Sequence, residues 1–449
     1  MPRAKCDGHF AMAQAADDSR SLGAFAPALV LLVICLVINY VDRGNLSVAA
    51  PLLKTELHLS SAKLGILFAA FFTTYTAMQF VIGWLVDHFD ANRILAAGFL
   101  LWSLATAVTG LVWGFAMLLT MRLILGIGES VALPSCSKIL AQHLPEHHRG
   151  FASGTLMSAL RCGNAVGTFG AGFLMARFGW RPIFIGVGLI SLVWLPAWTR
   201  WMPRNRLVLS HPADAGSGSA GPSSAGPSSA GPGFAAILRQ RSFWGTCAGH
   251  FSCNYLFYFM ITWLPTYLVL ERHLSMTTMT GVAGIYYSVD ALSAIASGWL
   301  QDFWIRQGLT PTLVRKSAMA IGFSVAAVAI AGCAVAGPNT YVPWLMAAGV
   351  GCGMTGPGLF TFPQTLAGTQ AVGRWYGWQN GFANLAGVVG PSLTGFVLQW
   401  TGNFRAPFAI TAALCIAGGL AWVFIVGRVE QVDWGTARTT SVTPVSAEA

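Results

Sequence analysis

Charged residues are scarce in this sequence. They make up 9% of its 449 residues, whereas a typical soluble domain contains about 25%. A chain this poor in charge cannot cover a water-facing surface, which excludes an assembly of soluble domains. The nine cysteines show neither metal-ligand spacing nor a disulfide framework and are best explained as small buried residues. No nucleophile and base stand in a plausible arrangement, so we expect no metal, no cofactor and no enzymatic activity.

Residues 1–23 lack the apolar segment of a secretory signal peptide and contain Asp7, Asp17 and Asp18. We therefore expect no cleavable signal. The formal net charge is +10, but the basic residues lie in short connections instead of forming a patch. A nucleic-acid partner is not expected, and the chain is predicted to be a monomer.

Long apolar runs are abundant, since 55% of the residues are hydrophobic and the mean hydropathy is +0.60. A helix that crosses a bilayer needs about 20 mainly apolar residues. The runs are continuous instead of alternating, which favours helices over barrel strands. The sequence therefore predicts an all-α integral membrane protein of twelve transmembrane helices, at residues 24–49, 61–86, 92–112, 114–137, 150–174, 180–202, 243–270, 278–301, 316–336, 341–364, 373–400 and 404–427.

The distribution of Lys and Arg predicts the orientation in the membrane. If the N-terminus is cytoplasmic, the cytoplasmic segments contain 17 of the 26 Lys and Arg residues and the other side contains six. Such an excess is the positive-inside signal. We predict that both termini are cytoplasmic and that the protein lies in the cell membrane, the inner membrane of a bacterium.

One polar stretch divides the chain. Residues 203–241 are rich in Gly, Ser and Pro, which cannot bury a core and indicate a linker. The predicted order is a cytoplasmic tail (1–23), a six-helix half (24–202), the cytoplasmic linker (203–241), a second six-helix half (242–427) and a cytoplasmic tail (428–449).

The two halves share sequence features in the same order. GWLVD begins at Gly83 and GWLQD begins at Gly298. NAVGTFGAG begins at Asn164, and NLAGVVGPS begins at Asn384. A parallel repeat of two six-helix halves is one transporter architecture, and its binding site lies between the halves.

Six charged residues lie deep within the apolar runs, away from the ends of these runs: Asp42, Arg43, Arg122, Glu129, Arg161 and Asp290. Each costs at least ~2.5–3.5 kcal/mol near the bilayer centre when charged, so such residues usually serve a function. The alternative is that they only pair across helices. Arg122 and Glu129 are seven residues apart and share one helix face with Gly126. Asp42 and Arg43 point about 100° apart, so only one of them can face a central cavity directly.

The chemistry of these side chains indicates their roles. A guanidinium group binds a carboxylate through two parallel hydrogen bonds, which makes Arg43 and Arg122 candidates to hold an anion. A carboxylate in a low-dielectric site loads and releases protons near neutral pH. Asp42 and Glu129 are therefore candidates to carry protons.

The loop after the second run resembles that of the major facilitator superfamily. The superfamily's motif is a Gly, an Asp four residues later and a basic residue beyond. It stands here as Gly83, Asp87 and Arg93, with a degenerate copy at Gly298, Asp302 and Arg315. In this family the motif implies a gating role. His88 and Asp90 depart from the pattern, because basic residues are usual there.

Two further motifs are more specific. Tyr40-Val-Asp42-Arg43 and the following Leu46 resemble the first-helix signature of the anion:cation symporter family, which includes galactonate and hexuronate permeases. The stretch from Arg122 to Glu129 resembles that family's Arg-x-x-x-Gly-x-x-Glu. The resemblance implies proton-coupled uptake of a small organic anion, such as a carboxylate, a sugar acid, a dicarboxylate or a sulfonated carboxylate. It implies the same roles for these residues: the arginines hold the anion, and the carboxylates carry protons.

Other residues are weaker candidates for the binding site. Tyr40 and Tyr75 offer hydroxyls, with core packing as an equal alternative. Asn384 lies where the family has a substrate-contacting amide, although hydrogen bonding between helices explains it equally well. His250 is better explained as a core histidine. The glycines between Gly351 and Gly356 imitate a nucleotide-binding motif, but they lie inside an apolar run and are expected to allow close helix packing.

Asp290 and Arg161 have no counterpart in the resemblance. Asp290 is interpreted as a second protonation site or as the partner of Arg161. If Arg161 is not paired with Asp290, a second anionic group on the substrate would compensate it. That reasoning favours a small or doubly charged anion over a hexonate.

Two other functions stay open. An anion exchanger would also use paired arginines, but it would not need Asp42 and Glu129. A sensor built on a transporter fold usually signals through a large soluble domain, which this sequence does not contain.

Overall fold

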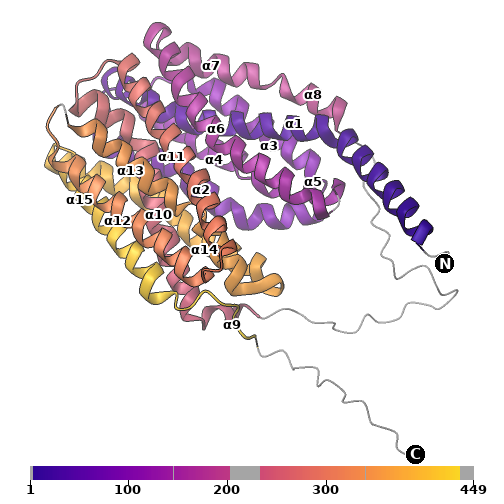
Figure 1. Cartoon of the computed structure of the whole chain (residues 1–449). Coiled ribbons are helices and arrows are strands. Elements are labelled where there is room, and N and C mark those ends of the chain that lie inside the picture. The colour runs from indigo at the N-terminus through magenta and orange to yellow at the C-terminus, as the bar shows by residue number, and fades with distance from the viewer. Residues whose placement is uncertain (1–3, 145, 203–232, 339, 435–449) are drawn as a thin grey trace, which may run out of the picture.

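The computed structural model describes residues 4–144, 146–202, 233–338 and 340–434 (Figure 1). All regular secondary structure in these ranges is helical. The first half contains α1 (Ala4–Glu56), α2 (Ser61–His88), α3 (Ala91–Thr109), α4 (Phe115–Glu129), α5 (Ala132–His143), α6 (Glu146–Phe178), α7 (Trp180–Ser191) and α8 (Trp194–Trp201). The pairs α4–α5 and α7–α8 each form one interrupted span.

The second half begins with the short helix α9 (Phe234–Leu238). Its spans are α10 (Arg241–Thr266) with η2 (Tyr267–Glu271), α11 (Met276–Arg306), α12 (Pro311–Val335), α13 (Tyr341–Thr355) with the beginning of α14 (Gly358–Thr401), the rest of α14, and α15 (Arg405–Leu420) with η3 (Ala421–Ile425). Gly368 separates the two parts of α14, because its φ of +63° is not helical. The twelve predicted helices are therefore present.

Some helices continue beyond the predicted membrane segments: the first segment was predicted at 24–49, and α1 continues past Pro51 to Glu56. Within the described residues, nine helices are long and apolar enough to cross a membrane. The other three spans, α2, α6 and α11, have 28, 33 and 31 residues, which is sufficient length. Most of the predicted linker lies outside the described residues, and its last part contains α9.

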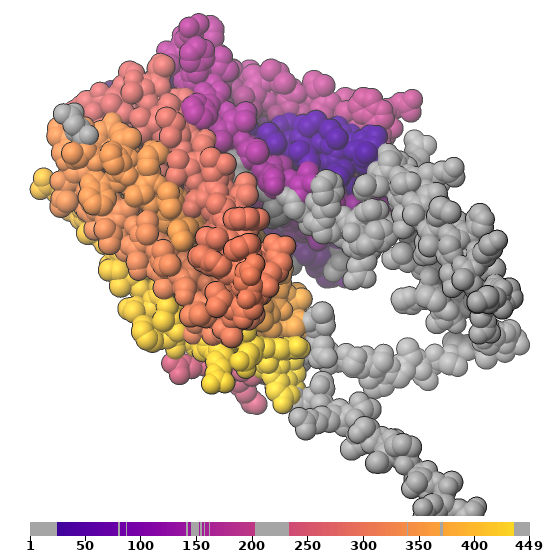
Figure 2. Space-filling view, in the orientation of Figure 1, coloured from indigo at the N-terminus to yellow at the C-terminus, as the bar shows by residue number. Residues whose placement is uncertain are grey.

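The helix contacts repeat between the halves, which supports the predicted duplication. α1 packs on α6, α2 on α4, and α3 on α7; correspondingly, α10 packs on α14, α11 on α13, and α12 on α15. Gly179 after α6 and Gly402 after α14 occupy equivalent corners with φ of +77° and +70°, a conformation that favours glycine. In Figure 2 the early and late parts of the chain occupy separate regions of the surface.

The halves meet through α2 with α14, α6 with α11, and α1 with α10. Exchange of the halves converts the first of these pairings into the second and leaves the third unchanged. We call the end of the bundle at Phe89, Gly308 and Gly368 the terminal face, and the end at His58, Gly179 and Gly402 the opposite face.

Glycines bring the halves into close contact near the opposite face. A Cβ on Gly65 of α2 would lie 2.6 Å from the carbonyl oxygen of Pro391 and 3.1 Å from Cα of Gly395 in α14. A Cβ on Gly172 of α6 would lie 2.1 Å from the Thr280 hydroxyl of α11. The Ala62 amide also donates to Oε1 of Gln399 at 3.1 Å. The opposite face is therefore closed by close packing of α2 on α14 and of α6 on α11.

We expect Gly65→Val to prevent this closure, because a side chain cannot fit against the α14 backbone. Uptake in proteoliposomes should fall by more than about tenfold, the equivalent of ~1.4 kcal/mol. Gly281→Val on α11 is the matched control, since nothing lies within 4 Å of a Cβ there. Normal uptake by the Gly65 variant would show that transport does not require this contact.

Candidate functional site

Two glycines in α4 set the depth of the site. A Cβ on Gly126 would lie 2.4 Å from the Phe71 carbonyl of α2, and a Cβ on Gly128 would lie 2.9 Å from the Trp102 amide of α3. α4 therefore packs closely against both helices. This packing places Arg122 and Glu129 inside the first half, and both are buried.

A buried ion pair connects α1 to α4. Nε of Arg43 donates to Oε2 of Glu129 at 2.8 Å, and the side chains are 9% and 0% exposed. The second carboxylate oxygen, Oε1, has no hydrogen-bond partner among the described residues. Since a charged carboxylate away from water needs its oxygens satisfied, Glu129 depends on Arg43 when ionised and has an oxygen available for a proton.

Aromatic rings enclose the Arg43 guanidinium. Its Cζ lies 4.7 Å from the ring centroid of Tyr40, 5.1 Å from that of Phe71 and 4.6 Å from that of Tyr75. Such contacts are worth about 2 kcal/mol or more when they are desolvated. The rings favour the charged form and keep the guanidinium in place when Glu129 is neutral.

Arg122, from α4, contacts the same Phe71 ring as Arg43. Its Cζ is 5.2 Å from the Phe71 centroid, and the residue is 4% exposed. Its Nε has no hydrogen-bond partner within the described part of the chain. Arg122 thus presents a donor that no protein acceptor uses, unlike Arg43.

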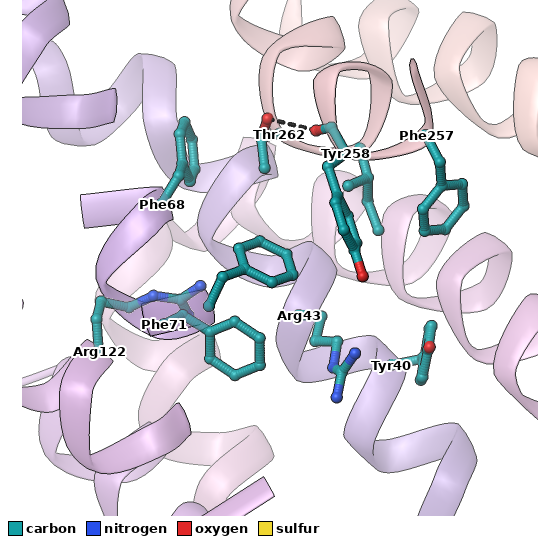
Figure 3. Close-up of a pocket in the computed structure, with 10 residues that line it drawn as sticks. Tyr40, Arg43, Phe68, Phe71, Arg122, Phe257, Tyr258 and Thr262 are labelled. Carbon is teal, nitrogen blue, oxygen red and sulfur yellow. Dashed lines mark hydrogen bonds between the residues drawn. The ribbon is translucent and has the colours of Figure 1, made fainter. Parts of the chain in front are cut away.

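Both arginines border a cavity between the two halves (Figure 3). The lining side chains come from α1, α2, α4 and α10: Tyr40, Arg43, Phe68, Phe71, Phe72, Arg122, Phe257, Tyr258, Ile261 and Thr262. The Tyr258 hydroxyl points toward the side of the cavity where Arg43 and Tyr40 lie. The cavity therefore brings two guanidinium groups to one place between the halves.

Asp42 faces away from this cavity, as expected for a neighbour of Arg43. It is buried, and its Oδ1 accepts from Nδ2 of Asn45 at 3.4 Å. Oδ2 has no hydrogen-bond partner among residues with described side chains. Asp42 is thus positioned behind the arginines and does not line the cavity.

Asn384 and His250 are both held by neighbours. The Tyr258 hydroxyl donates to Oδ1 of Asn384 at 2.8 Å, and Nδ1 of His250 lies 3.0 Å from Nε2 of Gln379. His250 is thus the core histidine that the sequence predicted.

Tyr258 was missed, although its place at the middle of a span could have identified it. Tyr75 packs on Arg43 without lining the cavity.

The glycines of the tenth span serve packing, as expected. A Cβ on Gly351 would lie 2.5 Å from the Ala326 amide of α12, and one on Gly353 would lie 2.2 Å from the Asp290 carbonyl of α11. Asp290 is itself buried and does not line the cavity described above. The side chain of Arg161 lies outside the described ones, so a pair between Arg161 and Asp290 stays a prediction.

The two loop motifs, at Gly83 and at Gly298, lie at the terminal face. Gly83 has open space around it, Arg93 is exposed, and the side chain of Asp87 lies outside the described ones. Lys138 of α5 donates to the carbonyl of Val86. The sequence did not single out this lysine.

In the second half, a Cβ on Gly298 would lie 3.6 Å from the Pro357 side chain. Asp302 is exposed. Arg315 donates to the Thr361 carbonyl at 3.3 Å and to the Thr365 hydroxyl. Both halves therefore have a basic side chain that braces two spans at this face.

Comparison with known proteins agrees with this architecture. The family model of the Major Facilitator Superfamily matches residues 32–377 and 313–447. A solved bacterial homolog of the human lysosomal transporter Spinster, in an inward-facing and unoccupied conformation, has a TM-score of 0.69 and 19% identity. That match covers 90% of this chain and 94% of the other.

Curated relatives match over almost their whole length. The hexuronate transporter of Bacillus subtilis is 28% identical, with 94% of this chain and 98% of the relative covered. The probable galactarate/D-glucarate transporter GarP of Escherichia coli K12 is 30% identical, with 93% and 98% covered. The probable sulfoacetate transporter SauU of Cupriavidus necator is 29% identical, with 88% and 93% covered.

The buried pair predicts a specific stability pattern. Arg43→Gln should destabilise the protein by about 3 kcal/mol, because it leaves Glu129 buried and uncompensated. The double variant Arg43→Gln/Glu129→Gln should recover part of this loss, which thermal unfolding of purified protein measures. The exposed pair between Arg181 and Glu56, at 3.0 Å, is the control and should show a coupling of about 0–1 kcal/mol. Additive effects at Arg43 and Glu129 would contradict the pair.

Proposed function

Because the chain belongs to the major facilitator superfamily, we propose that it takes up a small organic anion together with protons by alternating access. The names of its relatives, which refer to hexuronate, galactarate or D-glucarate, and sulfoacetate, support an anionic substrate. The observation that carries the proposal is the Arg43–Glu129 pair at the edge of a cavity between the halves.

The pair couples the two ligands through competition for one guanidinium. With Glu129 ionised, Arg43 is neutralised within the protein. Protonation of Glu129 removes that partner, and the guanidinium then needs an anion, since an uncompensated buried charge is costly. Each proton that enters Glu129 thereby favours the binding of a substrate carboxylate. Asp42, buried behind the arginines, serves as a second protonation site.

Arg122 and Arg43 hold the anion, and Tyr40, Tyr75 and Asn384 position it. Tyr75 acts by packing on Arg43, and Asn384 acts through Tyr258. Movement between the halves then exposes the cavity to one side at a time. The glycine contacts at the opposite face must separate for the substrate to enter there, and the bracing at the terminal face, with the motifs at Gly83 and Gly298, governs the other side.

Exchange of one anion for another is the alternative transport mode. It would use both arginines and leave Glu129 permanently ionised. Oε1 of Glu129 has no hydrogen-bond partner among the described residues. This favours a role for Glu129 as a proton carrier over a permanently ionised Glu129.

Glu129→Gln should separate binding from accumulation. The neutral amide imitates the protonated acid, so counterflow of substrate should continue while uptake driven by a pH gradient falls by at least about tenfold. Arg122→Ala should abolish counterflow as well, because the anion loses its charge partner. Uphill uptake that survives in both Glu129→Gln and Asp42→Asn, or that follows a sodium gradient, would contradict proton coupling through these carboxylates.

The excess of basic residues beside the terminal face predicts that this face is cytoplasmic in the bacterial inner membrane. A reporter that is active only in the cytoplasm should be active when it is fused after residue 220 or at the C-terminus. The same reporter inserted at Gly402 should be inactive. Activity of a translocated reporter at residue 220 would contradict the orientation and the proposed boundaries of the two halves.

A further inference from the structure

The cavity offers few polar groups apart from its two arginines. Five of its lining side chains are pure hydrocarbon: Phe68, Phe71, Phe72, Phe257 and Ile261. They come from both halves, since the first three belong to α2 and the other two to α10. A substrate held between the halves therefore meets apolar surface on both sides.

Hydroxyl groups are present on Tyr40, Tyr258 and Thr262, but two of them are already used as donors. The Thr262 hydroxyl donates to the Tyr258 carbonyl at 2.6 Å, and the Tyr258 hydroxyl donates to Asn384 at 2.8 Å. These two hydroxyls therefore have their hydrogens committed within the protein, and they offer a substrate only acceptor lone pairs.

The positive charges, in contrast, are concentrated on one ring. The guanidinium carbons of Arg43 and Arg122 lie 5.1 and 5.2 Å from the centroid of Phe71. Arg122 has an unpartnered Nε within the described part of the chain and is 4% exposed. A carboxylate bound to Arg122 would place the rest of its molecule against the phenylalanines.

We infer that the substrate is a carboxylate with a flat apolar body, an arylcarboxylate, and not a sugar acid. This inference rests on the proposed function. Each sugar hydroxyl left without a partner in such a site loses the hydrogen bonds that it makes to water. An aromatic ring instead gains free energy of binding from the burial of its apolar surface, and its contacts with other rings add to that gain.

The test compares benzoate with glucuronate in binding to the full-length purified protein, by titration calorimetry at constant pH. Binding is the primary readout, because neutral benzoic acid crosses bilayers without a transporter. We expect benzoate to bind at least about tenfold more tightly, which corresponds to ~1.4 kcal/mol. Arg122→Gln should weaken benzoate binding by a similar factor. Tighter binding of glucuronate, or of the compact dianion succinate, would overturn the inference.

Phe257→Asn provides a second arm, since it replaces part of the apolar lining with an amide. The ratio of benzoate to glucuronate affinity should fall by about tenfold or more. Phe251→Asn, on the same helix but outside the cavity lining, is the matched control and should leave the ratio unchanged. An unchanged ratio in Phe257→Asn, with both variants folded by thermal unfolding, would overturn the assignment.

Uptake in proteoliposomes, with protein-free liposomes as the blank, separates this inference from the proposed function. Benzoate binding that depends on Phe257, without pH-driven accumulation of any acid, would sink the symport mechanism and keep the substrate class. Proton-driven accumulation with a preference for glucuronate would keep the symport mechanism and sink the substrate class.

Discussion

The ion pair between Arg43 and Glu129 is the interaction on which the arrangement of the site depends. It joins α1 to α4 across 2.8 Å with both side chains nearly inaccessible. Coulombic attraction is strong in such a low-dielectric region, but so is the cost of removing each charge from water. Aromatic rings from α1 and α2 reduce that cost for the arginine only. Glu129 has one oxygen without a hydrogen-bond partner among the described residues, so it is the member of the pair that can take up a proton.

The pair can form only because glycines allow the helices to approach each other. Gly126 and Gly128 permit α4 to pack against α2 and α3. Gly163 of α6 lies close to α1, since a Cβ on it would lie 2.7 Å from the Val37 carbonyl. The same device closes the opposite face at Gly65 and Gly395. Small residues at helix interfaces are the usual means of packing in a membrane, where no hydrophobic force drives association. The site and the closed face thus share one structural principle.

Much of this could be predicted from the sequence because membrane-spanning segments obey simple rules. Length and hydropathy identified the twelve helices, and the paired motifs at Gly83 and Gly298 identified the repeat. The scarcity of membrane charge made Arg43, Arg122, Asp42 and Glu129 conspicuous. Their separation in sequence gave no distances, however, and the ion partner of Arg43 became visible only in three dimensions.

The apolar part of the site was not predictable in the same way. Phenylalanines are common in every span, so nothing in the sequence distinguishes Phe68 or Phe257, which line the cavity, from rings that face lipid. Tyr258 was missed as well, although its position at the middle of a span could have identified it. The part of α1 beyond residue 49 was not predicted either, because it adds polar residues up to Glu56 to an apolar run.

The unequal surroundings of the two arginines imply an order of events in the proposed cycle. Nε of Arg122 has no hydrogen-bond partner within the described part of the chain, so this arginine keeps a donor for a carboxylate whatever the state of Glu129. Arg43 becomes available only after Glu129 is protonated, because until then it has a partner at 2.8 Å. The first arginine therefore provides affinity, and the second makes affinity depend on the proton. With both arginines in the role of Arg122, the site would bind anions well and would have no means of linking that binding to the proton gradient.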